Sequence, residues 1–587
     1  MDSRTRIRLG RSAGGLTGLA VVAVLAATGV PASASTPTGP LVGVIVRATS
    51  AADVTRVQAA VRQSGGAVGR PLALISGFAA QVPSGALPAL RAAGGVAEVT
   101  ADTAVRMKAD KWIDDGGKNI AVDSVKKAAG GKKKDNTVDT ASLTGAGIGV
   151  ALIDSGVAPV TGLNQPGKVI NGPDLSFESQ TPGLADIDTY GHGTHMAGII
   201  AGSDPTTSTG AVGFQGVAPG AHLISLKVAA ADGASDVSQV IAGIDWVVSH
   251  RNDPGLNIRV LNLSFGTDSS QDEKLDPISY AVEAAWRNGI VVVVSVGNDG
   301  AAATRVTMPA ANPYVIAVGA ADPNGTDVRT DDTVATFSTR GNAGRHADLL
   351  AAGRSVVSLR DPGSYIDDNY PGARVADAAG QLRFFRGSGT SQAAAVVSGS
   401  VALLLQQRPG LTPDQVKNLL VQSADPLTGA DPIATGAGQL DIAGAATLQV
   451  PLNAKQSYPA ATGLGSLEGS RGSAHVAAAA TGLLLTGEKD IFGAPWTPAT
   501  WTAAAKNGKA WSGGTWNGKV WAGSAFTGQS WASGTWGTVT WSSLTWSGQS
   551  WTSGVWSGRS WAAGSWSGRS WAGATWCGRS WTGRSWA

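Results

Sequence analysis

Three polar residues of this 587-residue chain lie in glycine-rich segments that suit nucleophilic catalysis. Asp154 opens an Asp-Ser-Gly tripeptide, His192 lies within Gly-His-Gly-Thr-His at 191–195, and Ser391 ends Gly-Ser-Gly-Thr-Ser at 387–391. A serine hydroxyl needs an adjacent base to remove its proton, and an imidazole, which titrates near neutral pH, can act as that base. A carboxylate must then orient the imidazole and stabilise its protonated form. Together the three residue types predict an acyl-transfer site.

The elements that must position these residues are indicated by short apolar runs, most of them rich in Val and Ile. Such runs are typical of strands that are buried on both faces of a parallel sheet. We expect strands at residues 148–153, 223–228, 258–265, 290–296 and 315–319. Because helical patterns alternate with these runs, the sequence predicts an α/β domain with helices layered on a mainly parallel sheet.

Apolar spacing and capping residues indicate the helices between the strands. Residues 236–250 carry apolar side chains at helical spacing, and residues 277–288 follow an Asp-Pro pair that suits a helix start. A capping box marks another helix start at Thr412. Ser391 precedes the apolar segment 392–406, which places it at the start of a helix. Backbone N–H groups and the helix dipole make such a position suitable for holding an oxyanion.

Polar or glycine-rich segments follow three of the predicted strands directly. They are Asp154 after the first strand, Ser264, Phe265 and Gly266 at the end of the third, and Gly297 and Asn298 after the fourth. In an open parallel sheet, ligands bind beyond the carboxyl ends of the strands. We therefore expect these segments to converge on one edge of the sheet.

Each of these short motifs also has an ordinary interpretation as a turn or a helix cap. The Asp-Ser-Gly tripeptide at Asp154 would also suit an aspartic protease, but that class needs a second such motif and none is present. His195 lies one helical turn after His192 and could pair with it at a metal. No acidic or cysteine ligand lies nearby in sequence, so we expect a structural role for His195 and assign no metal ligands.

Taken in the order Asp154, His192, Ser391, the motifs resemble the subtilase family. The resemblance covers most of residues 145–447, with matching blocks at 150–156, 191–195, 216–219, 261–266, 296–298 and 389–391. It implies a subtilisin-like three-layer domain and a serine endopeptidase that works through an acyl-enzyme. It also implies that Ser391 is the nucleophile, His192 the general base and then acid, and Asp154 the orienting carboxylate. Asn298 and the Ser391 backbone N–H would form the oxyanion hole.

The resemblance further implies how a polypeptide substrate binds. Ser264, Phe265 and Gly266 would pair with it as an added strand, with Gly297 also in the substrate-binding site. Asp299 either lies at the rim of the primary pocket, where it would favour basic side chains, or is a solvated loop residue. The chemistry requires no cofactor, and no spacing here assigns the structural calcium sites found in the family.

The sequence departs from the family next to the nucleophile. The family usually has Met-Ala-x-Pro-His after the serine, whereas here residues 392–396 are Gln-Ala-Ala-Ala-Val. Ala352 likewise stands where members commonly have proline. Because the Gly-Thr-Ser lead-in is present, these changes bear on the shape of the pocket more than on the chemistry.

The N-terminal residues indicate export and processing. Residues 1–34 combine four arginines, an apolar run at 16–30 and an Ala-Ser-Ala site, which is the order of a cleaved signal peptide. The apolar run is shorter than the roughly 20 residues that an uncleaved membrane anchor needs. Residues 35–107 form a small α+β unit that resembles the family's ferredoxin-like inhibitory propeptide. By that resemblance the unit blocks the cleft and is removed by self-cleavage within about 104–117, so that we expect a secreted or cell-wall-associated zymogen.

The remaining boundaries follow changes in composition. We expect a lysine-rich linker and the start of the mature enzyme at 108–144, the catalytic domain at 145–450, a linker at 451–495 and a Trp-rich region at 496–587. In that region an aromatic residue falls on nearly every fifth position. This period fits a β-solenoid, a chain of short hairpins or low-complexity disorder. The sole cysteine, Cys577, either replaces a Ser or Ala of this repeat without a role of its own, which we favour, or cross-links two chains.

The Trp-rich region leaves two classes of function open. Exposed Trp and Arg could bind cell-wall polysaccharide or acidic polymers, or the repeat could be a structural spacer. A surface-binding protein with a catalytically dead α/β scaffold is the alternative to an endopeptidase, and the presence of Asp154, His192, Asn298 and Ser391 argues against it. No nucleic-acid partner is expected, because the net charge is only +3 and no basic domain is present.

Overall fold

The computed structural model describes most of the chain between residues 39 and 520. The described residues are 39–72, 76–101, 120–121, 143–179, 184–204, 213–326, 328–476, 484–491, 493–512 and 515–520, with four residue pairs at 535–536, 539–540, 559–560 and 569–570. The expected signal peptide, the expected self-cleavage region, Cys577 and most of the Trp-rich repeat lie outside them. Among the described helices, none has the length and apolar character needed to cross a bilayer.

The central sheet is mainly parallel, as the sequence predicts. Its strands are β6 (Gly149–Asp154), β7 (Val169–Asn171), β8 (His222–Lys227), β9 (Ile258–Leu263), β10 (Val291–Ser295), β11 (Ile316–Asp322), β12 (Thr333–Val334) and β13 (Leu349–Ala352). They lie in the order β12-β11-β10-β9-β6-β8-β7, with β13 also paired to β11. Only β12 pairs in the antiparallel sense among these strands. Strands β6 and β10 are buried along their whole length, which explains their unbroken apolar sequence.

Strand β6 lies at the point where the strand order reverses. From β6 the chain passes to β8 on one side, and the next long strand, β9, pairs on the other side of β6. A crevice opens at the carboxyl ends of strands at such a reversal. Asp154 is the last residue of β6 and therefore lies at this crevice.

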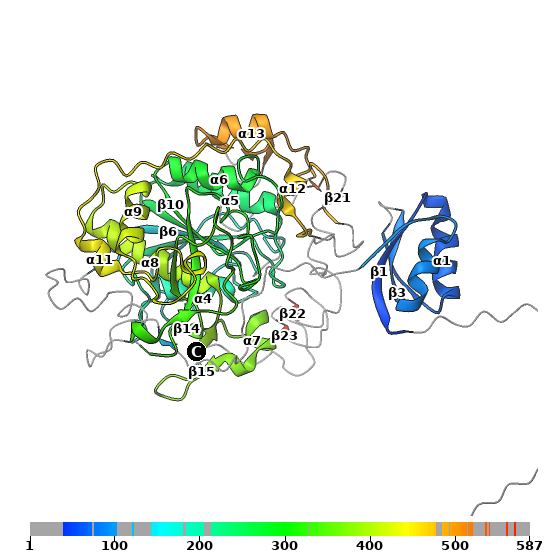
Figure 1. The fold of residues 1–587 in the computed structure, drawn as a ribbon. Coiled ribbons are helices and arrows are strands. Elements are labelled where there is room, and N and C mark those ends of the chain that lie inside the picture. Colours follow the sequence, from blue (N-terminus) through cyan, green and yellow to red (C-terminus); the bar gives the residue numbers. More distant parts are fainter. Residues whose placement is uncertain are drawn as a thin grey trace, which may run out of the picture.

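Helices cover both faces of the sheet, which gives three layers (Figure 1). The long helices are α4 (His192–Ala201), α5 (Val237–His250), α6 (Pro277–Arg287), α8 (Thr390–Gln407) and α9 (Pro413–Ser423). Helix α8 packs against α4 and crosses β9, β10 and β11, whereas α5 and α6 pack together and contact β6 and β10. Shorter helices are α7 (Tyr365–Asn369), α10 (Pro432–Thr435), α11 (Ile442–Thr447), α12 (Leu467–Arg471) and α13 (Pro498–Ala505).

The predicted helix starts are confirmed by their caps. Asp236 and Thr412 each form a capping box at the start of α5 and α9, and the Asp276 side chain accepts from two N–H groups at the start of α6. One boundary differs from expectation, because strand β9 ends at Leu263 and residues 264–266 leave the sheet. Helix α4 begins at His192 itself.

A small four-stranded antiparallel sheet precedes the three-layered domain in the chain (blue in Figure 1). Its strands β1 (Leu41–Ala48), β2 (Ala67–Leu72), β3 (Gly77–Pro83) and β4 (Val96–Ala101) lie in the order β2-β3-β1-β4. Helices α1 (Val54–Gln63) and α2 (Leu87–Arg91) complete the unit, which has a separate apolar core. The sequence did not indicate β2, which contains Pro71. Because β2 is an edge strand, it tolerates a proline.

A second four-stranded sheet leads into α8, the helix that contains Ser391. It has the order β15-β16-β14-β5, from β5 (Ile120–Ala121), β14 (Val356–Leu359), β15 (Arg374–Val375) and β16 (Phe384–Gly387). Strand β16 ends three residues before α8 begins, so that the glycine-rich segment between them forms the turn to Ser391.

The segment after residue 450, where we predicted a linker, contributes buried contacts to the face formed by α5 and α6. Arg471 is fully buried and pairs with Asp236 at 2.7 Å, and the Ser470 hydroxyl donates to Asp276 at 2.8 Å. The indole N–H groups of Trp501 and Trp516 both donate to Asp245 on α5, at 2.7 and 2.8 Å. The hairpin strands β17 (Trp511–Ser512), β18 (Thr515–Trp516) and β19 (Lys519–Val520) follow. The beginning of the Trp-rich region therefore extends the hydrophobic core.

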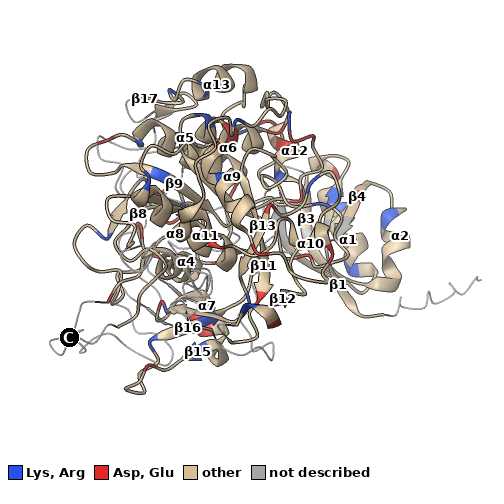
Figure 2. Cartoon of the chain, turned by 60° about the vertical axis from the view of Figure 1, so that its left-hand side comes forward, with Lys and Arg blue, Asp and Glu red and all other residues tan. Residues whose placement is uncertain are grey.

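The last strands assigned are two-residue pairs. They are β20 (Thr535–Trp536) with β21 (Val539–Thr540), and β22 (Arg559–Ser560) with β23 (Arg569–Ser570). Acidic and basic residues are mixed over the ribbon in Figure 2, and no single-sign face is visible in that view. This agrees with the small net charge of the whole chain.

Candidate active site

The carboxylate of Asp154 and the imidazole of His192 form a buried hydrogen-bonded pair. The His192 Nδ1 atom lies 2.7 Å from Oδ1 and 2.9 Å from Oδ2 of Asp154. Both residues are almost completely buried. A carboxylate on Nδ1 fixes the ring orientation and the tautomer, so that Nε2 is the nitrogen that can act as a base. The structure thus brings together two of the predicted site residues.

A second carboxylate, Asp188, fixes the start of α4. Its Oδ1 accepts from the Gly191 N–H at 2.6 Å and from the Ser155 hydroxyl at 2.8 Å, and its Oδ2 accepts from the Thr194 N–H at 2.7 Å. The same Ser155 hydroxyl accepts from the Gly193 N–H at 2.9 Å. These bonds satisfy N–H groups of the first turn of α4, which carries His192. Burial raises the pKa of Asp188 above its ordinary value, while these bonds act in the opposite direction.

The backbone around His192 requires glycine. Gly191 has a φ of 102°, in the left-handed region that side chains disfavour. A side chain at Gly193 would collide with the backbone carbonyl oxygen of Gly156. The glycines on either side of His192 therefore allow the first turn of α4 to lie directly against the segment that follows β6.

An internal ion pair holds the loop that precedes His192. The Lys227 ammonium, at the end of β8, donates to Glu178 Oε2 at 2.6 Å and to the Ile187 carbonyl at 2.5 Å. The Thr189 hydroxyl also donates to Glu178, at 2.5 Å. Although burial alone lowers the pKa of Lys227, the Glu178 and Asp174 carboxylates outweigh it and raise that pKa above its usual value. No motif in the sequence marks Lys227, Glu178 or Thr189 as residues that support the site.

Ser391 is the second residue of α8 and is 5% exposed. Helix α8 packs against α4, the helix of His192. Ser391 lines a small pocket at the carboxyl edge of the central sheet, and the Ser264 hydroxyl donates to its carbonyl oxygen at 3.4 Å. The pocket is lined by Ser264, Phe265, Gly266, Ser295, Gly297, Asn298, Thr307, Thr390 and Ser391. All of the residues that we predicted to bind substrate or the oxyanion are therefore around this pocket.

Thr390 fixes the orientation of the Asn298 amide. The amide oxygen of Asn298 accepts from the Thr390 N–H at 2.9 Å and from the Thr390 hydroxyl at 3.0 Å. The Gly297 N–H donates to the same hydroxyl at 3.3 Å. Because Thr390 holds the amide oxygen of Asn298, the amide nitrogen is the end of the group that faces away from Thr390. Thr390 was missed as a site residue, although it directly precedes Ser391 in the Gly-Thr-Ser motif.

Gln392, where the family usually has methionine, is fully buried. Neither its amide oxygen nor its amide nitrogen has a hydrogen-bond partner among the described residues. An unsatisfied buried polar group costs about 1–3 kcal/mol. This chain therefore has a polar side chain where the family usually has an apolar one, and no hydrogen bond among the described residues offsets the cost of burying it.

The other candidates lie outside the pocket. His195 Nε2 lies 3.1 Å from the Phe385 carbonyl, which is a structural contact. Asp299 does not line the pocket, and its N–H donates to Thr339. In the part of the chain that the structure describes, no group of three or more His, Cys, Asp or Glu residues is arranged to hold a metal ion.

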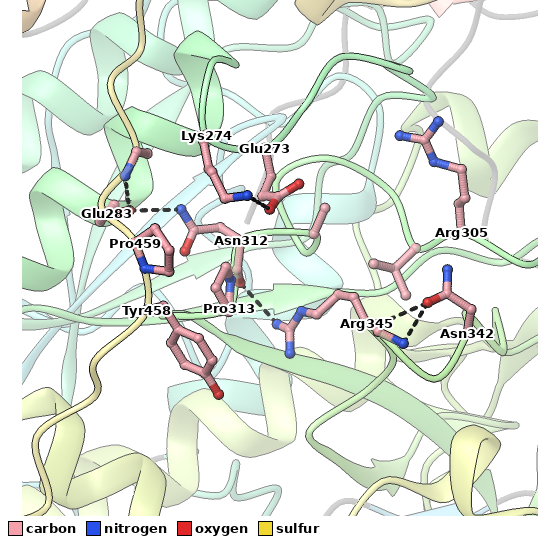
Figure 3. Close-up of a pocket in the computed structure, with 14 residues that line it drawn as sticks. Glu273, Lys274, Glu283, Arg305, Asn312, Pro313, Asn342, Arg345, Tyr458 and Pro459 are labelled. Atoms are coloured by element: carbon pink, nitrogen blue, oxygen red, sulfur yellow. Dashed lines mark hydrogen bonds and ion pairs between the residues drawn. The ribbon is translucent and has the colours of Figure 1, made fainter.

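A larger cavity of about 460 Å³ lies elsewhere, and none of Asp154, His192 and Ser391 lines it (Figure 3). Its buried polar groups bond to one another. The Asn312 amide donates to Glu283 at 3.3 Å, and the Arg345 guanidinium donates to the Asn312 carbonyl at 3.0 Å. Val306 lines this cavity while its neighbour Thr307 lines the small pocket, so that the two hollows are separated by one extended segment.

Comparison with known proteins relates the chain to one family of hydrolases. Residues 145–438 match the Subtilase family, Peptidase S8. Serine protease AprX of Bacillus subtilis is 39% identical over 51% of this chain and 66% of its own length. Subtilisin DY of Bacillus licheniformis is 33% identical over 53% of this chain and 96% of its own length.

A solved structure shows a weaker similarity. Fervidolysin from Fervidobacterium pennivorans, described as a keratinolytic enzyme related to subtilisin, is 25% identical, with a TM-score of 0.46. The match covers 70% of this chain and 62% of fervidolysin. The chain thus spans a little under two thirds of both AprX and fervidolysin, and nearly all of subtilisin DY.

Proposed function

The chain belongs to the subtilase family of serine proteases, and from this membership we propose that it is a secreted endopeptidase whose triad is Asp154, His192 and Ser391. The observation that carries the proposal is the buried Asp154–His192 pair, 2.7 Å apart at the strand reversal. The helix that begins at His192 packs against the helix that presents Ser391 to the pocket.

The chemistry follows from these roles. An extended polypeptide lies along residues 264–266, and His192 takes the proton of Ser391 as the serine oxygen attacks the substrate carbonyl. Asp154 stabilises the imidazolium, which then gives its proton to the leaving amine as the C–N bond breaks. Water, deprotonated by His192, attacks the acyl-enzyme and releases the carboxylic acid product. Ser391 recovers its proton from His192 in this last step.

The oxyanion of each tetrahedral intermediate is stabilised by two donors in this proposal, the Asn298 amide and the Ser391 backbone N–H. The hydrogen bonds from Thr390 to the Asn298 oxygen support the required orientation of that amide. Loss of one such donor typically costs about 100- to 1000-fold in rate, a magnitude known from subtilisin itself.

We propose that residues 35–107 are an inhibitory propeptide which the enzyme removes by self-cleavage after export. The separate core of this unit supports folding as an independent body. The tryptophans at the start of the tail, Trp496, Trp501, Trp511 and Trp516, are at most 5% exposed, which supports a structural role for the first repeats. Binding of cell-wall polymer remains a prediction for the residues after 520.

The test is covalent labelling of the purified full chain with a serine-directed fluorophosphonate, followed by peptide mapping. We expect the label on Ser391, and we expect Ser391→Ala to lose both the label and propeptide removal. A Ser391→Ala chain that still processes itself would refute self-cleavage. Absence of the label from correctly folded wild-type protein, together with absence of peptide hydrolysis, would favour the catalytically dead scaffold.

A further inference from the structure

The Arg345 guanidinium lies among backbone carbonyl oxygens of the segment 310–315, which leads into β11. Its nitrogen atoms donate to the carbonyls of Ala310 and Asn312 at 2.8 and 3.0 Å, and one nitrogen lies 3.5 Å from the carbonyl of Val315. Figure 3 shows the guanidinium directed at Asn312 from the wall of the larger cavity. One side-chain cation therefore ties three carbonyl groups of this segment together.

A second cation, Lys417 on α9, bonds to the same segment. Its ammonium donates to the carbonyls of Pro313 and Val315 at 2.7 and 2.9 Å. The carboxylate of Asp348 joins the two cations, because its Oδ1 lies 3.0 Å from Arg345 and 3.1 Å from Lys417. Burial acts to raise the pKa of Asp348, but the two cations outweigh it and hold that pKa below its ordinary value.

These oxygen atoms form what we call the oxygen cage, which consists of the Asp348 carboxylate and four carbonyls, those of Ala310, Asn312, Pro313 and Val315. Carboxylate and carbonyl oxygens are the ligands that Ca²⁺ prefers, and the ion takes six to eight of them at about 2.3–2.6 Å. The Nη2 atom of Arg345 already has three cage oxygens within 3.5 Å. The cage therefore resembles a calcium site in its chemistry, with a guanidinium where the ion would be.

The charges of the two arrangements are equal. Burial lowers the pKa of Lys417 to about 8, so that its ammonium is still charged at pH 7. The cage then holds two positive charges, from Arg345 and Lys417, against the single negative charge of Asp348. One Ca²⁺ ion in place of both side chains would leave the same net charge. With both side chains present, an added ion would meet occupied oxygens and two like charges, so that the residues do not fit a metal.

We propose that Arg345 and Lys417 take the place of one divalent cation in the oxygen cage, so that the segment 310–315 is held without a metal ion. The subtilase family has structural calcium sites, whereas this part of the chain carries its own cations. The segment follows closely on Thr307, which lines the pocket beside Ser391. A chelator should therefore leave this wall of the pocket unchanged.

The test removes the built-in cations and asks whether a metal ion replaces them. Arg345→Ala/Lys417→Met is made in the full chain with Ser391→Ala, which prevents autolysis, and is stripped with EDTA. Its Tm is then measured at pH 7 without metal, with CaCl₂ and with MgCl₂. We expect a lower Tm than that of the parent without metal, and a calcium-induced rise about 4 °C or more larger than that of the parent. Mg²⁺ should do less, because it demands a smaller octahedral site.

Equilibrium dialysis against radioactive calcium counts the ions directly. The double variant should bind one more ion per chain than the parent, and subtracting the parent removes the contribution of calcium bound elsewhere. The matched control is Arg340→Ala/Lys455→Met, which removes the same two charges from positions outside the cage. This control should bind no additional ion.

Each outcome decides the inference. A double variant that folds without metal and gains no more from Ca²⁺ than the parent overturns it, and so do equal numbers of bound ions in the two chains. If the double variant does not fold, Arg345→Ala alone decides, because it leaves a vacancy of one charge. KCl should then raise its Tm by about 2 °C or more above tetramethylammonium chloride, whose cation is too large for the cage.

Identical Tm values of Arg345→Ala in the two salts would also overturn the inference. None of these measurements uses the activity of the enzyme, so that the inference fails or stands separately from the proposed function.

Discussion

Asp245 offers a quantitative test of how the C-terminal segment is attached to the catalytic domain. This carboxylate is buried within α5 and accepts the indole N–H groups of Trp501 and Trp516 on one oxygen. Burial raises its pKa to about 7 from a model-compound value of 3.8, even though the two indole bonds act in the opposite direction. Asp245→Asn keeps an oxygen acceptor for both indoles and removes the ionisation.

The sign of the effect follows from proton binding. Well below pH 3.8 the Asp245 carboxyl is protonated in both the folded and unfolded states, so that its ionisation does not affect the free energy of unfolding. Between about pH 4 and pH 7 the unfolded state ionises first, so that folding loses about 1.4 kcal/mol per pH unit. Above pH 7 the loss is constant at about 4 kcal/mol, which is the upper limit of what Asp245→Asn can recover.

The assay is the free energy of unfolding by urea as a function of pH, in a Ser391→Ala background that prevents autolysis. The difference between Asp245→Asn and Asp245 should grow from pH 4.5 to pH 7 and then level off. Asp253→Asn, an exposed position in the turn after α5, is the matched control and should show no such growth. A difference that is the same at pH 4.5 and pH 8 would refute the assignment of a raised pKa to Asp245.

Two further predictions concern the active site. Asp188→Asn puts an amide in place of a carboxylate that accepts the Gly191 and Thr194 N–H groups, so that the first turn of α4 shifts. Steady-state kinetics should show kcat lowered about 10- to 100-fold with KM little changed. An unchanged kcat would show that the position of His192 does not depend on this cap. Gln392→Met removes a buried amide that has no hydrogen-bond partner among the described residues, and should raise the free energy of unfolding by about 1–3 kcal/mol. Urea unfolding in the Ser391→Ala background measures this difference. A loss of stability would mean that the Gln392 amide does form hydrogen bonds in the folded protein.

Much of the fold could be predicted because its signals are local in sequence. Strands such as β6 and β10 are buried on both faces and are therefore mostly apolar, and α5, α6 and α9 start at a capping box or an Asp-Pro pair. Asp154, Ser264 and Asn298 could be placed together because parallel strands bring the residues after their carboxyl ends to one edge. The pocket lining confirms this convergence for Ser264 and Asn298.

What could not be predicted depends on contacts between distant segments. Lys227 and Glu178 are ordinary charged residues in sequence, and only the fold makes them a buried pair. Thr307 belongs to no motif that the sequence marked, yet its side chain lies against both Gly266 and Gly297 in the pocket lining. Asp188 lies only four residues before His192, but nothing in its type distinguishes a helix cap from a solvated loop residue.

The buried pairing of Arg471 with Asp236, and of Trp516 with Asp245, bears on the order in which the molecule can be completed. A chain emerging from a ribosome or a translocation channel presents the two aspartates more than 200 residues before the groups that neutralise or solvate them. Helix α5 therefore reaches its final stability only after residue 516 has been synthesised. A protease assembled in this way completes the packing of α5 later than it acquires Asp154, His192 and Ser391, which all precede Arg471 in the chain.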